Sequence, residues 1–307
     1  MLKFIRIAVA LAALVTVLLP TPALAQRADL SWKWIDGATS RYRMVESMAQ
    51  SISGAASTDL SWVRTVEFTQ TVESTSKGSV VSRTYDRVAV ELDEAGKITK
   101  FDSDVASTFG NAAHPMIAPF TKMTGKILRV ELDADSMVTG DDGPPELFEA
   151  MLGPLSQSNA GLAGLAPTGD QSTRLIEQTQ SALDIIPGRR VRRGQSWIVD
   201  IPHAVPLTGD LASDISCTLK SARRNRASIL IEGHLSQTDG ESGLALLKLK
   251  EGVIEGTIEF DTEEGQIRKQ QIEMVSEWST TNELLEALGA EETTQSLRQS
   301  VELVRIR

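Results

Sequence analysis

The feature that most constrains this chain is an alternation of apolar and polar side chains that recurs along most of its length. Val66, Phe68 and Val72 fall on one face of a run whose other residues are rich in Thr and Glu. Ile254 and Ile258 repeat the same spacing near the other end of the chain. A period of two is the period of a β-strand, whose successive side chains point to opposite faces. One apolar and one polar face indicate antiparallel sheets with one side open to water.

The alternation divides the expected strands into two groups separated by a different pattern. Between the groups, apolar residues recur at helical spacing instead. At the end of the chain, Val301-Glu302-Leu303-Val304 favours a closing strand over a helix for Thr293 to Arg307. The other strands are expected at 42–52, 66–72, 79–93, 97–103 and 125–133, then at 196–201, 210–220, 227–238, 254–260 and 272–278.

Helices are expected mainly in the middle of the chain. Pro145 is well placed to open one helix, and Asp170 to cap a second that carries Leu175, Ile176, Thr179 and Leu183. A Gly-, Ala- and Ser-rich stretch at 157–169 is expected to link them. Shorter helices are expected at 115–123 and, after Asn282, at 283–288.

The predicted fold is therefore a β-rich α+β fold. It consists of two antiparallel β-meander halves, either curved sheets or a partial barrel, with helices in the middle segment. The expected units are a signal peptide at 1–25, an N-terminal β-rich half at 26–140, a helical linker segment at 141–190 and a C-terminal β-rich half at 191–307.

A short sequence pattern that recurs in both halves suggests that the two halves are related. Three runs, Val90 to Asp93, Val130 to Asp133 and Ile258 to Asp261, each end a strand in Asp before a short polar turn. An Asp carboxylate at such a corner accepts hydrogen bonds from the turn's own backbone. We therefore expect these acidic residues to form hairpin corners and not a metal site.

The first 25 residues have the parts of a signal peptide. Lys3 and Arg6 precede an apolar stretch from Ile7 to Leu19, which is short for a membrane span of roughly 20 residues. Small residues then lead to a cleavage site expected between Ala25 and Gln26. Gln26 stands where a lipoprotein needs Cys, so we expect a soluble protein, secreted or periplasmic.

Charge argues against nucleic acid as a partner. Without residues 1–25 the chain keeps 29 basic residues against 41 acidic ones, a formal charge of −12. Nucleic-acid binding needs many Lys and Arg to neutralise phosphates. The densest basic run, Arg189 to Arg193, is expected to be a solvated loop before a strand, with an anion contact or a processing site as the alternative.

Several short motifs carry a resemblance to known sequences. They are Leu30-Ser31-Trp32-Lys33-Trp34 with Gly37 and Tyr42, Tyr85-Asp86-Arg87-Val88, Phe101-Asp102-Ser103, Gly194-Gln195-Ser196-Trp197, and Gly256-Thr257-Ile258-Glu259-Phe260-Asp261 with Gly265. In these motifs the chain resembles a family of uncharacterised, exported, β-rich bacterial proteins classed as a domain of unknown function. The resemblance implies architecture and location and offers no catalytic or ligand-binding residues to carry over.

Catalytic chemistry has no clear candidate. Cys217, the only cysteine, lies in a strand-like run and is expected to be a buried core residue, so no disulfide forms within the chain. Ser196 lacks the closing Gly of a nucleophile elbow. His114, His203 and His234 are too scattered for a metal site and are expected on the surface or on strands. No catalytic, cofactor-binding or metal-binding residue is therefore assigned.

Three functions remain open. The first is a non-enzymatic binding or envelope-associated module with an envelope protein as partner. The second is a carrier of an apolar ligand or lipid, resembling periplasmic lipoprotein carriers. The third, a hydrolase with an unrecognised site, ranks last. In the carrier, Met116, Phe120, Met123, Phe148 and Met151 would line the cavity, whereas the favoured interpretation of these residues is ordinary packing of helices on sheets.

Overall fold

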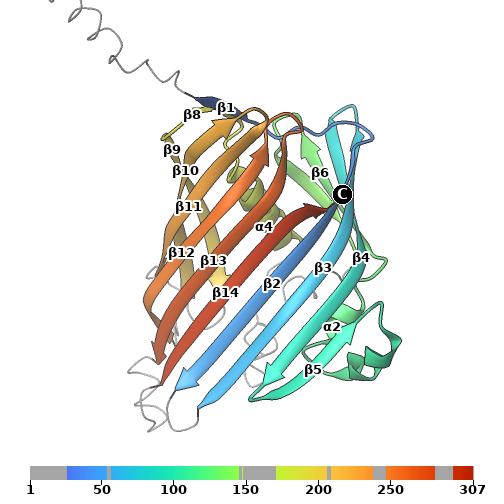
Figure 1. The fold of residues 1–307 in the computed structure, drawn as a ribbon, viewed down its shortest axis with the longest axis vertical. Helices are drawn as coiled ribbons and strands as arrows, with labels where there is room; N and C mark the ends of the chain where they lie inside the picture. The colour runs from blue at the N-terminus through green and yellow to red at the C-terminus, as the bar shows by residue number, and fades with distance from the viewer. Residues whose placement is uncertain are drawn as a thin grey trace, which may run out of the picture.

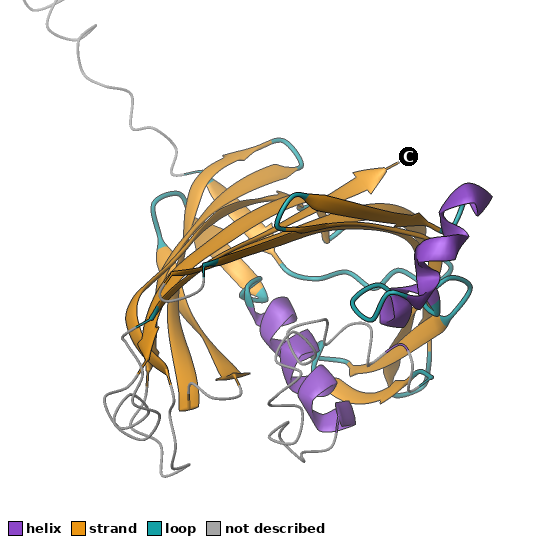
Figure 2. Cartoon of the chain, turned by 90° about the horizontal axis from the view of Figure 1, so that it is seen from below, coloured by secondary structure: helices purple, strands orange, loops and turns teal. Residues whose placement is uncertain are grey.

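The computed structural model describes residues 26–53, 57–144, 147, 171–205, 209–237, 247–280 and 293–306. Its main feature is one antiparallel sheet of 12 strands, bent into an arch that stays open (Figure 1 and Figure 2). A separate two-stranded ribbon lies at one end of the arch. The β-rich, antiparallel fold expected from the alternation is confirmed.

The strand order follows the chain closely. Along the sheet it is β7-β6-β4-β3-β2-β14-β13-β12-β11-β10-β9, with β5 also pairing with β4, while β1 and β8 form the ribbon. The strands are β1 (Arg27–Leu30), β2 (Thr39–Ser53), β3 (Thr58–Ser74), β4 (Gly78–Glu94), β5 (Lys97–Asp102), β6 (Ile127–Asp133), β7 (Val138–Asp142), β8 (Arg189–Arg192), β9 (Ser196–Val205), β10 (Gly209–Arg223), β11 (Arg226–Gln237), β12 (Leu247–Asp261), β13 (Gln266–Thr280) and β14 (Thr294–Ile306).

The closing strand joins the two groups of strands into one sheet. β14 pairs with β13 on one side and with β2 on the other, in register from Thr294 opposite Ser53 to Ile306 opposite Arg41. This confirms the expectation of a strand at the end of the chain. Because β14 lies in the middle of the sheet, it forms the crown of the arch (Figure 2).

Glycines allow neighbouring strands to approach closely where the sheet coils. A Cβ at Gly256 on β12 would lie 2.4 Å from the backbone oxygen of Gln271 on β13. At Gly233 on β11 it would lie 2.9 Å from the backbone oxygen of Asp214. Both glycines belong to the concave face, and residues without side chains at such positions allow a sheet to bend.

A helix lies on the concave side of the arch and connects its two edges. α4 (Gln171–Asp184) contacts both edge strands, β7 and β9. The Val138 backbone N–H of β7 donates to Oε1 of Gln180 at 2.7 Å. On the opposite edge, Nε1 of Trp197 donates to the backbone oxygen of Ile185, just after the helix, at 3.1 Å. The expected helix in the middle of the chain is therefore observed, and it bridges the ends of the sheet.

Two clusters of buried side chains fill the flanks of the arch. An N-terminal cluster lies on β2 to β6 and includes Leu183 of α4. A C-terminal cluster lies on β9 to β13 and includes Ile185 and Ile186. Trp32 and Leu303 pack against both clusters. The core is thus divided into two clusters, one on each flank, which are joined by Trp32 and Leu303.

Some expected helices and loops differ from the structure. In place of one helix at 115–123, the chain forms a 3-10 helix, η1 (Ala106–Ala113), and a short α2 (Ala118–Thr121). His114 between them is extended, with φ −62° and ψ 128°, which interrupts helical hydrogen bonding. The expected helices at Pro145 and 283–288, the Asp170 cap and the linker at 157–169 lie outside the described residues.

The basic run is a strand and not the expected loop. Arg189 to Arg192 form β8, which pairs antiparallel with β1. Ala28 and Leu30 of β1 and Val191 of β8 all belong to the C-terminal cluster, so the ribbon is held by burial of its inner face. With one apolar residue in four, β8 carries too short a pattern to be recognised from sequence.

The aspartate corners form as expected. At Asp93, Oδ1 accepts the Gly96 N–H at 2.7 Å, and at Asp133 it accepts the Met137 N–H at 2.9 Å. At Asp261, Oδ1 accepts two N–H groups of the following turn, at 2.9 and 3.0 Å. These carboxylates stabilise turns, and among the described residues no group of acidic, His or Cys side chains is arranged to hold a metal ion.

Candidate functional site

The pairing register places the concave side chains in rows that cross the sheet. One row begins at Trp197 on β9 and ends at Phe101 on β5. Its members are Trp197, Cys217, Ile231, Gly256, Ile272, Val301, Glu46, Arg64, Val90 and Phe101. Apolar residues and Gly occupy every position except two. This row of the concave face is therefore apolar from edge to edge, except at Glu46 and Arg64.

The apolar face is not equally covered along its length. On the flanks, side chains such as Ile231 and Val90 are buried. At the crown, several concave side chains of β2, β13 and β14 are only partly buried, although Tyr42, Met48, Ser276 and Trp278 on the same face are buried. We call the following partly buried apolar residues the central strip: Met44, Ile272, Met274, Leu297, Val301 and Leu303. The strip lies between the two clusters on the side of the sheet that faces α4 (Figure 2).

One end of the strip is closed by a segment that crosses the arch before β2. The rings of Trp32 and Trp34 stack with centroids 5.4 Å apart, and Trp32 meets Phe260 edge-on at 5.7 Å. Nε1 of Trp32 donates to the backbone oxygen of Leu183 at 2.9 Å, and Nε1 of Trp34 donates to Oγ of Ser136 at 2.9 Å. Both indole groups are satisfied, so this segment is fixed to α4 and to the β6–β7 turn.

An ion pair interrupts the apolar row beside the strip. Nε of Arg64 donates to Oε2 of Glu46 at 2.8 Å, and the Arg64 side chain is 5% exposed. The guanidinium carbon lies 4.7 Å from the ring centroid of Phe120 and 5.7 Å from that of Trp62. Aromatic faces attract such a cation. The pair is therefore part of the packed N-terminal flank and is screened from water.

Two buried tyrosines border the strip on the same flank. Burial raises the pKa of both Tyr42 and Tyr85 above the usual value, although nearby arginines oppose the shift. The Tyr42 hydroxyl lies 3.5 Å from Oε1 of Gln266, to which it donates. Both phenols thus stay neutral at physiological pH, and both residues belong to the N-terminal cluster.

The residues considered for catalysis are not brought together. Cys217 is fully buried, and burial raises the pKa of its thiol to about 12, which suppresses the reactive thiolate. Nε2 of His114 lies 3.0 Å from Oε2 of Glu94, whereas His234 is exposed on β11. His203 lies on β9, but its side chain is outside the described residues.

The apolar lining expected on the helices is wrong for two of its members. Phe120 and Met123 are each 1% exposed and belong to the N-terminal cluster. Met116 is partly buried beside a small third cluster, and Phe148 and Met151 lie outside the described residues. The partly exposed apolar residues are on the sheet instead. The sequence showed the alternation of these residues, but it did not show that they stay partly exposed.

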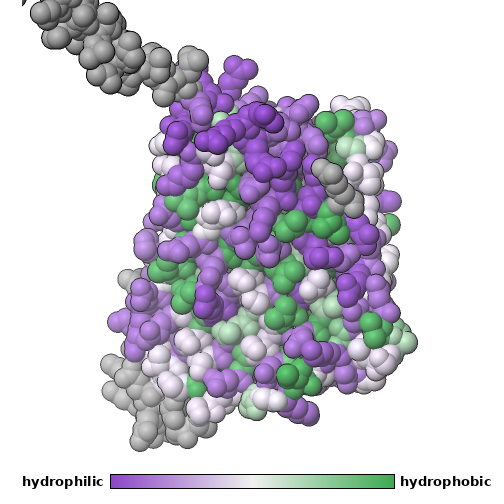
Figure 3. Space-filling model, viewed as in Figure 1, coloured by the Kyte–Doolittle hydropathy of each residue, from purple (hydrophilic) through white to green (hydrophobic). Residues whose placement is uncertain are grey.

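The convex face has the opposite character. Figure 3 shows it covered largely by hydrophilic side chains with scattered hydrophobic ones. Glu67 accepts hydrogen bonds from Arg41 at 2.9 Å and from Arg43 at 3.0 Å. Arg87 donates to Asp102 at 2.6 Å, and this hydrogen bond lowers the pKa of the Asp102 carboxyl. The convex face is therefore a solvated, ion-paired surface, as the alternation predicts.

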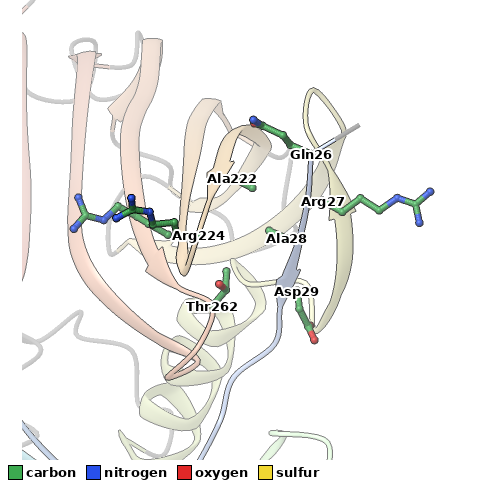
Figure 4. A pocket seen from close by; sticks show the side chains of 8 residues that line it. Gln26, Arg27, Ala28, Asp29, Ala222, Arg224 and Thr262 are labelled. Atoms are coloured by element: carbon green, nitrogen blue, oxygen red, sulfur yellow. The ribbon is translucent and has the colours of Figure 1, made fainter. Parts of the chain in front are cut away.

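Two depressions lie at the end of the arch near β1. One, of about 390 Å³, lies beside Trp32, between the β6–β7 turn and the end of α4. The other, of about 380 Å³, lies between the start of β1 and the β10–β11 turn, and its lining includes Arg27, Arg224 and Arg226 (Figure 4). Among the described residues, no helix is long and apolar enough to cross a membrane.

Fold and site together define an open antiparallel partial barrel that holds a helix on its concave side. Residues 77–267 match the model of a family of unknown function, DUF6263, and the chain belongs to that family. The match agrees with the resemblance to a domain of unknown function. No curated protein matches the chain.

Solved structures show only distant similarity. A structure titled "Lipid-protein interactions in lipovitellin" has 10% sequence identity and a TM-score of 0.49, covering 90% of this chain and 26% of that chain. The chain thus spans about a quarter of the lipovitellin chain. The β domain of the Bordetella autotransporter BrkA has 9% identity and a TM-score of 0.22, covering 88% of this chain and 100% of its own.

Proposed function

We propose that this protein is an exported carrier that binds an extended apolar ligand, an acyl chain, along the central strip. The observation that carries the proposal is the partial exposure of apolar side chains on β14 and its two neighbours, between flanks that are buried. Contiguous exposed apolar surface is a common mark of a binding site. Here it lies on the concave side of a curved sheet, where a ligand is enclosed on several sides.

The dimensions and composition of the strip favour a long, flexible ligand. From Leu297 to Leu303 the strip follows β14 for six residue steps, about 20 Å at roughly 3.3 Å per residue, and Gln299 interrupts its apolar side chains. Met44 and Met274 lie on either side of it. Methionine side chains adapt their shape to different partners. The strip therefore fits a class of related acyl chains better than one rigid molecule.

Polar groups inside the strip and beside its Leu297 end suit a ligand with a polar head. Gln50 lies directly opposite Leu297, and Gln299 lies directly opposite Met48. Next to Met48, the buried indole nitrogen of Trp62 has no hydrogen-bond partner among the described residues. A buried donor without an acceptor costs free energy. A carboxylate or ester oxygen of the ligand would give this donor an acceptor.

Export rests on the N-terminal residues alone. Lys3 and Arg6, the apolar stretch and the small residues up to Ala25 support cleavage before Gln26. N-terminal sequencing of the protein recovered outside the cytoplasm tests this part. A first residue other than Gln26, or an intact Met1, would contradict it.

A matched pair of variants tests ligand binding. Val301 and Val304 are partly buried valines on β14, three residues apart, so their side chains point to opposite faces. We expect fluorescence titration with cis-parinaric acid to show saturable binding, and Val301→Gln to weaken it about tenfold through lost apolar contact. Val304→Gln on the convex face should bind like the unmodified protein. Absence of binding, or equal weakening by both variants, would contradict the proposal.

A further inference from the structure

A dense basic surface stands out on a chain that carries a formal charge of −10. It is formed by the β1–β8 ribbon and the turn that joins β10 to β11. Residues 26–30, 189–193 and 220–226 contain nine basic side chains and one acidic one, Asp29. All nine are exposed, and we call them the basic rim: Arg27, Arg189, Arg190, Arg192, Arg193, Lys220, Arg223, Arg224 and Arg226.

The rim brings several like charges side by side, although Asp29 lies directly opposite Arg190 in the ribbon. Arg27 lies directly opposite Arg192 in the ribbon, and Arg223 lies directly opposite Arg226 at the hairpin end. Directly opposed like charges destabilise a pair of strands. Among the described residues, Arg226 has a carboxylate at 3.7 Å, on Glu259, whereas no ion pair is found for Arg27, Arg192 or Arg223.

The charges are spread over a surface and do not converge on a point. In Figure 4, the side chains of Arg27 and Arg224 extend to opposite sides of the depression between β1 and the β10–β11 turn. A single small anion needs donors that point toward it. An extended layer of anions is matched better by outward-pointing guanidinium groups, each of which contacts a different negative charge.

We infer that the basic rim docks the protein on an anionic lipid membrane. A membrane fits better than nucleic acid because an exposed apolar side chain adjoins the rim. Ile198 on β9 is 68% exposed; it lies directly opposite Ser216, four residues along β10 from Lys220. Basic residues with a neighbouring apolar side chain are typical of membrane-surface binding. This inference rests on the rim and is independent of ligand binding at the strip.

Vesicle flotation of the full chain tests the inference. The measured quantity is the ratio of affinities for vesicles with 30% phosphatidylglycerol in phosphatidylcholine and for pure phosphatidylcholine vesicles. Each basic residue near an anionic surface contributes roughly a factor of five, so Arg27→Gln/Arg192→Gln/Arg223→Gln should lower the ratio about a hundredfold. The matched control, Lys97→Gln/Lys122→Gln/Arg129→Gln, removes the same charge from exposed residues elsewhere and should leave it unchanged.

The salt dependence and two competing anions distinguish a membrane from other sources of negative charge. We expect the preference for anionic vesicles to disappear as the salt concentration rises to about 0.5 M, because salt screens exposed charges. An unmodified protein without this preference, or two triple variants with equal ratios, would overturn the inference. Millimolar inorganic phosphate that abolishes vesicle binding, or equally tight binding of a DNA duplex, would also overturn it by assigning the rim to another anion.

Discussion

The flanks and the crown of the arch have the same strand pattern but not the same cover. On the flanks, concave side chains such as Phe260 and Val90 are packed under α4, α2 or the Trp32–Trp34 segment and are buried. At the crown, Val301 lies in the same row as Val90 and Leu297 on the same face, and both remain partly exposed. The difference therefore comes from what packs on the sheet and not from the sheet itself.

Folding stability and ligand binding therefore depend on different residues of the same concave face. A side chain buried on a flank contributes its full apolar area to folding. A side chain on the central strip still exposes area that a ligand can bury. Substitutions on the flanks should therefore lower the free energy of unfolding, whereas substitutions on the strip should mainly lower ligand affinity.

The largest expected effect is on the C-terminal flank. Phe260 is fully buried, contacts Trp32 edge-on and belongs to the C-terminal cluster. Phe260→Ala should lower the free energy of unfolding by about 3–5 kcal/mol, because it removes a buried ring and leaves a cavity. Urea denaturation followed by tryptophan fluorescence measures this loss. A loss below about 1 kcal/mol would show that the flank is not packed as described.

The next largest loss of stability is expected for the Arg64–Glu46 ion pair on the N-terminal flank. Arg64→Ala leaves Glu46 without its partner in a mostly buried setting and should cost about 2–4 kcal/mol. The double variant Glu46→Leu/Arg64→Met replaces the pair with apolar side chains of similar size. It should recover most of the lost stability in the same denaturation assay. A double variant as unstable as Arg64→Ala would mean that the flank needs the charges themselves.

A smaller loss of stability is expected at the buried Asp261 hairpin corner, and a still smaller one at the more exposed Asp93 corner. Burial alone would raise the pKa of Asp261, but backbone N–H groups of Glu264 and Glu263 and the side chain of Arg268 lower it overall. Asp261→Asn should cost about 1–2 kcal/mol at pH 7 through the lost charged interactions. Asp93→Asn, at a partly exposed corner, should cost less.

The pH dependence of the Asp261 effect has a definite sign. A carboxyl whose pKa is lowered by folding stabilises the protein above its unfolded pKa, and this contribution disappears as the pH falls through the folded pKa. The unmodified protein and Asp261→Asn should therefore differ at pH 7 and converge below about pH 4. Denaturation series at several pH values measure the difference, and a constant gap across the range would contradict the assignment.

The smallest effect on stability is expected at the crown. Leu297→Ala on the strip should lower the free energy of unfolding by about 1 kcal/mol or less, because its side chain is only partly removed from water. Its affinity for cis-parinaric acid should fall at the same time. A stability loss as large as that of Phe260→Ala would place Leu297 in the core and weaken the distinction between crown and flank.

The sequence predicted the strands far better than it predicted the site. Alternation along residues such as Val66 and Phe68 indicates which side chains share a face, and the structure confirms it. Coverage of that face depends on α4 and Trp32, which come from distant parts of the chain. The Arg189–Arg192 strand has no readable alternation, since its pairing with β1 depends on a tertiary contact.

The most direct test of the central claim is photocrosslinking with a fatty acid that carries a diazirine on its chain. After irradiation of the unmodified protein, mass spectrometry of peptides locates the label. Labels are expected on concave positions of β2, β13 and β14, with Met44, Met274 and Val301 among them. Labels confined to convex positions, or labelling that excess unlabelled fatty acid does not prevent, would contradict it.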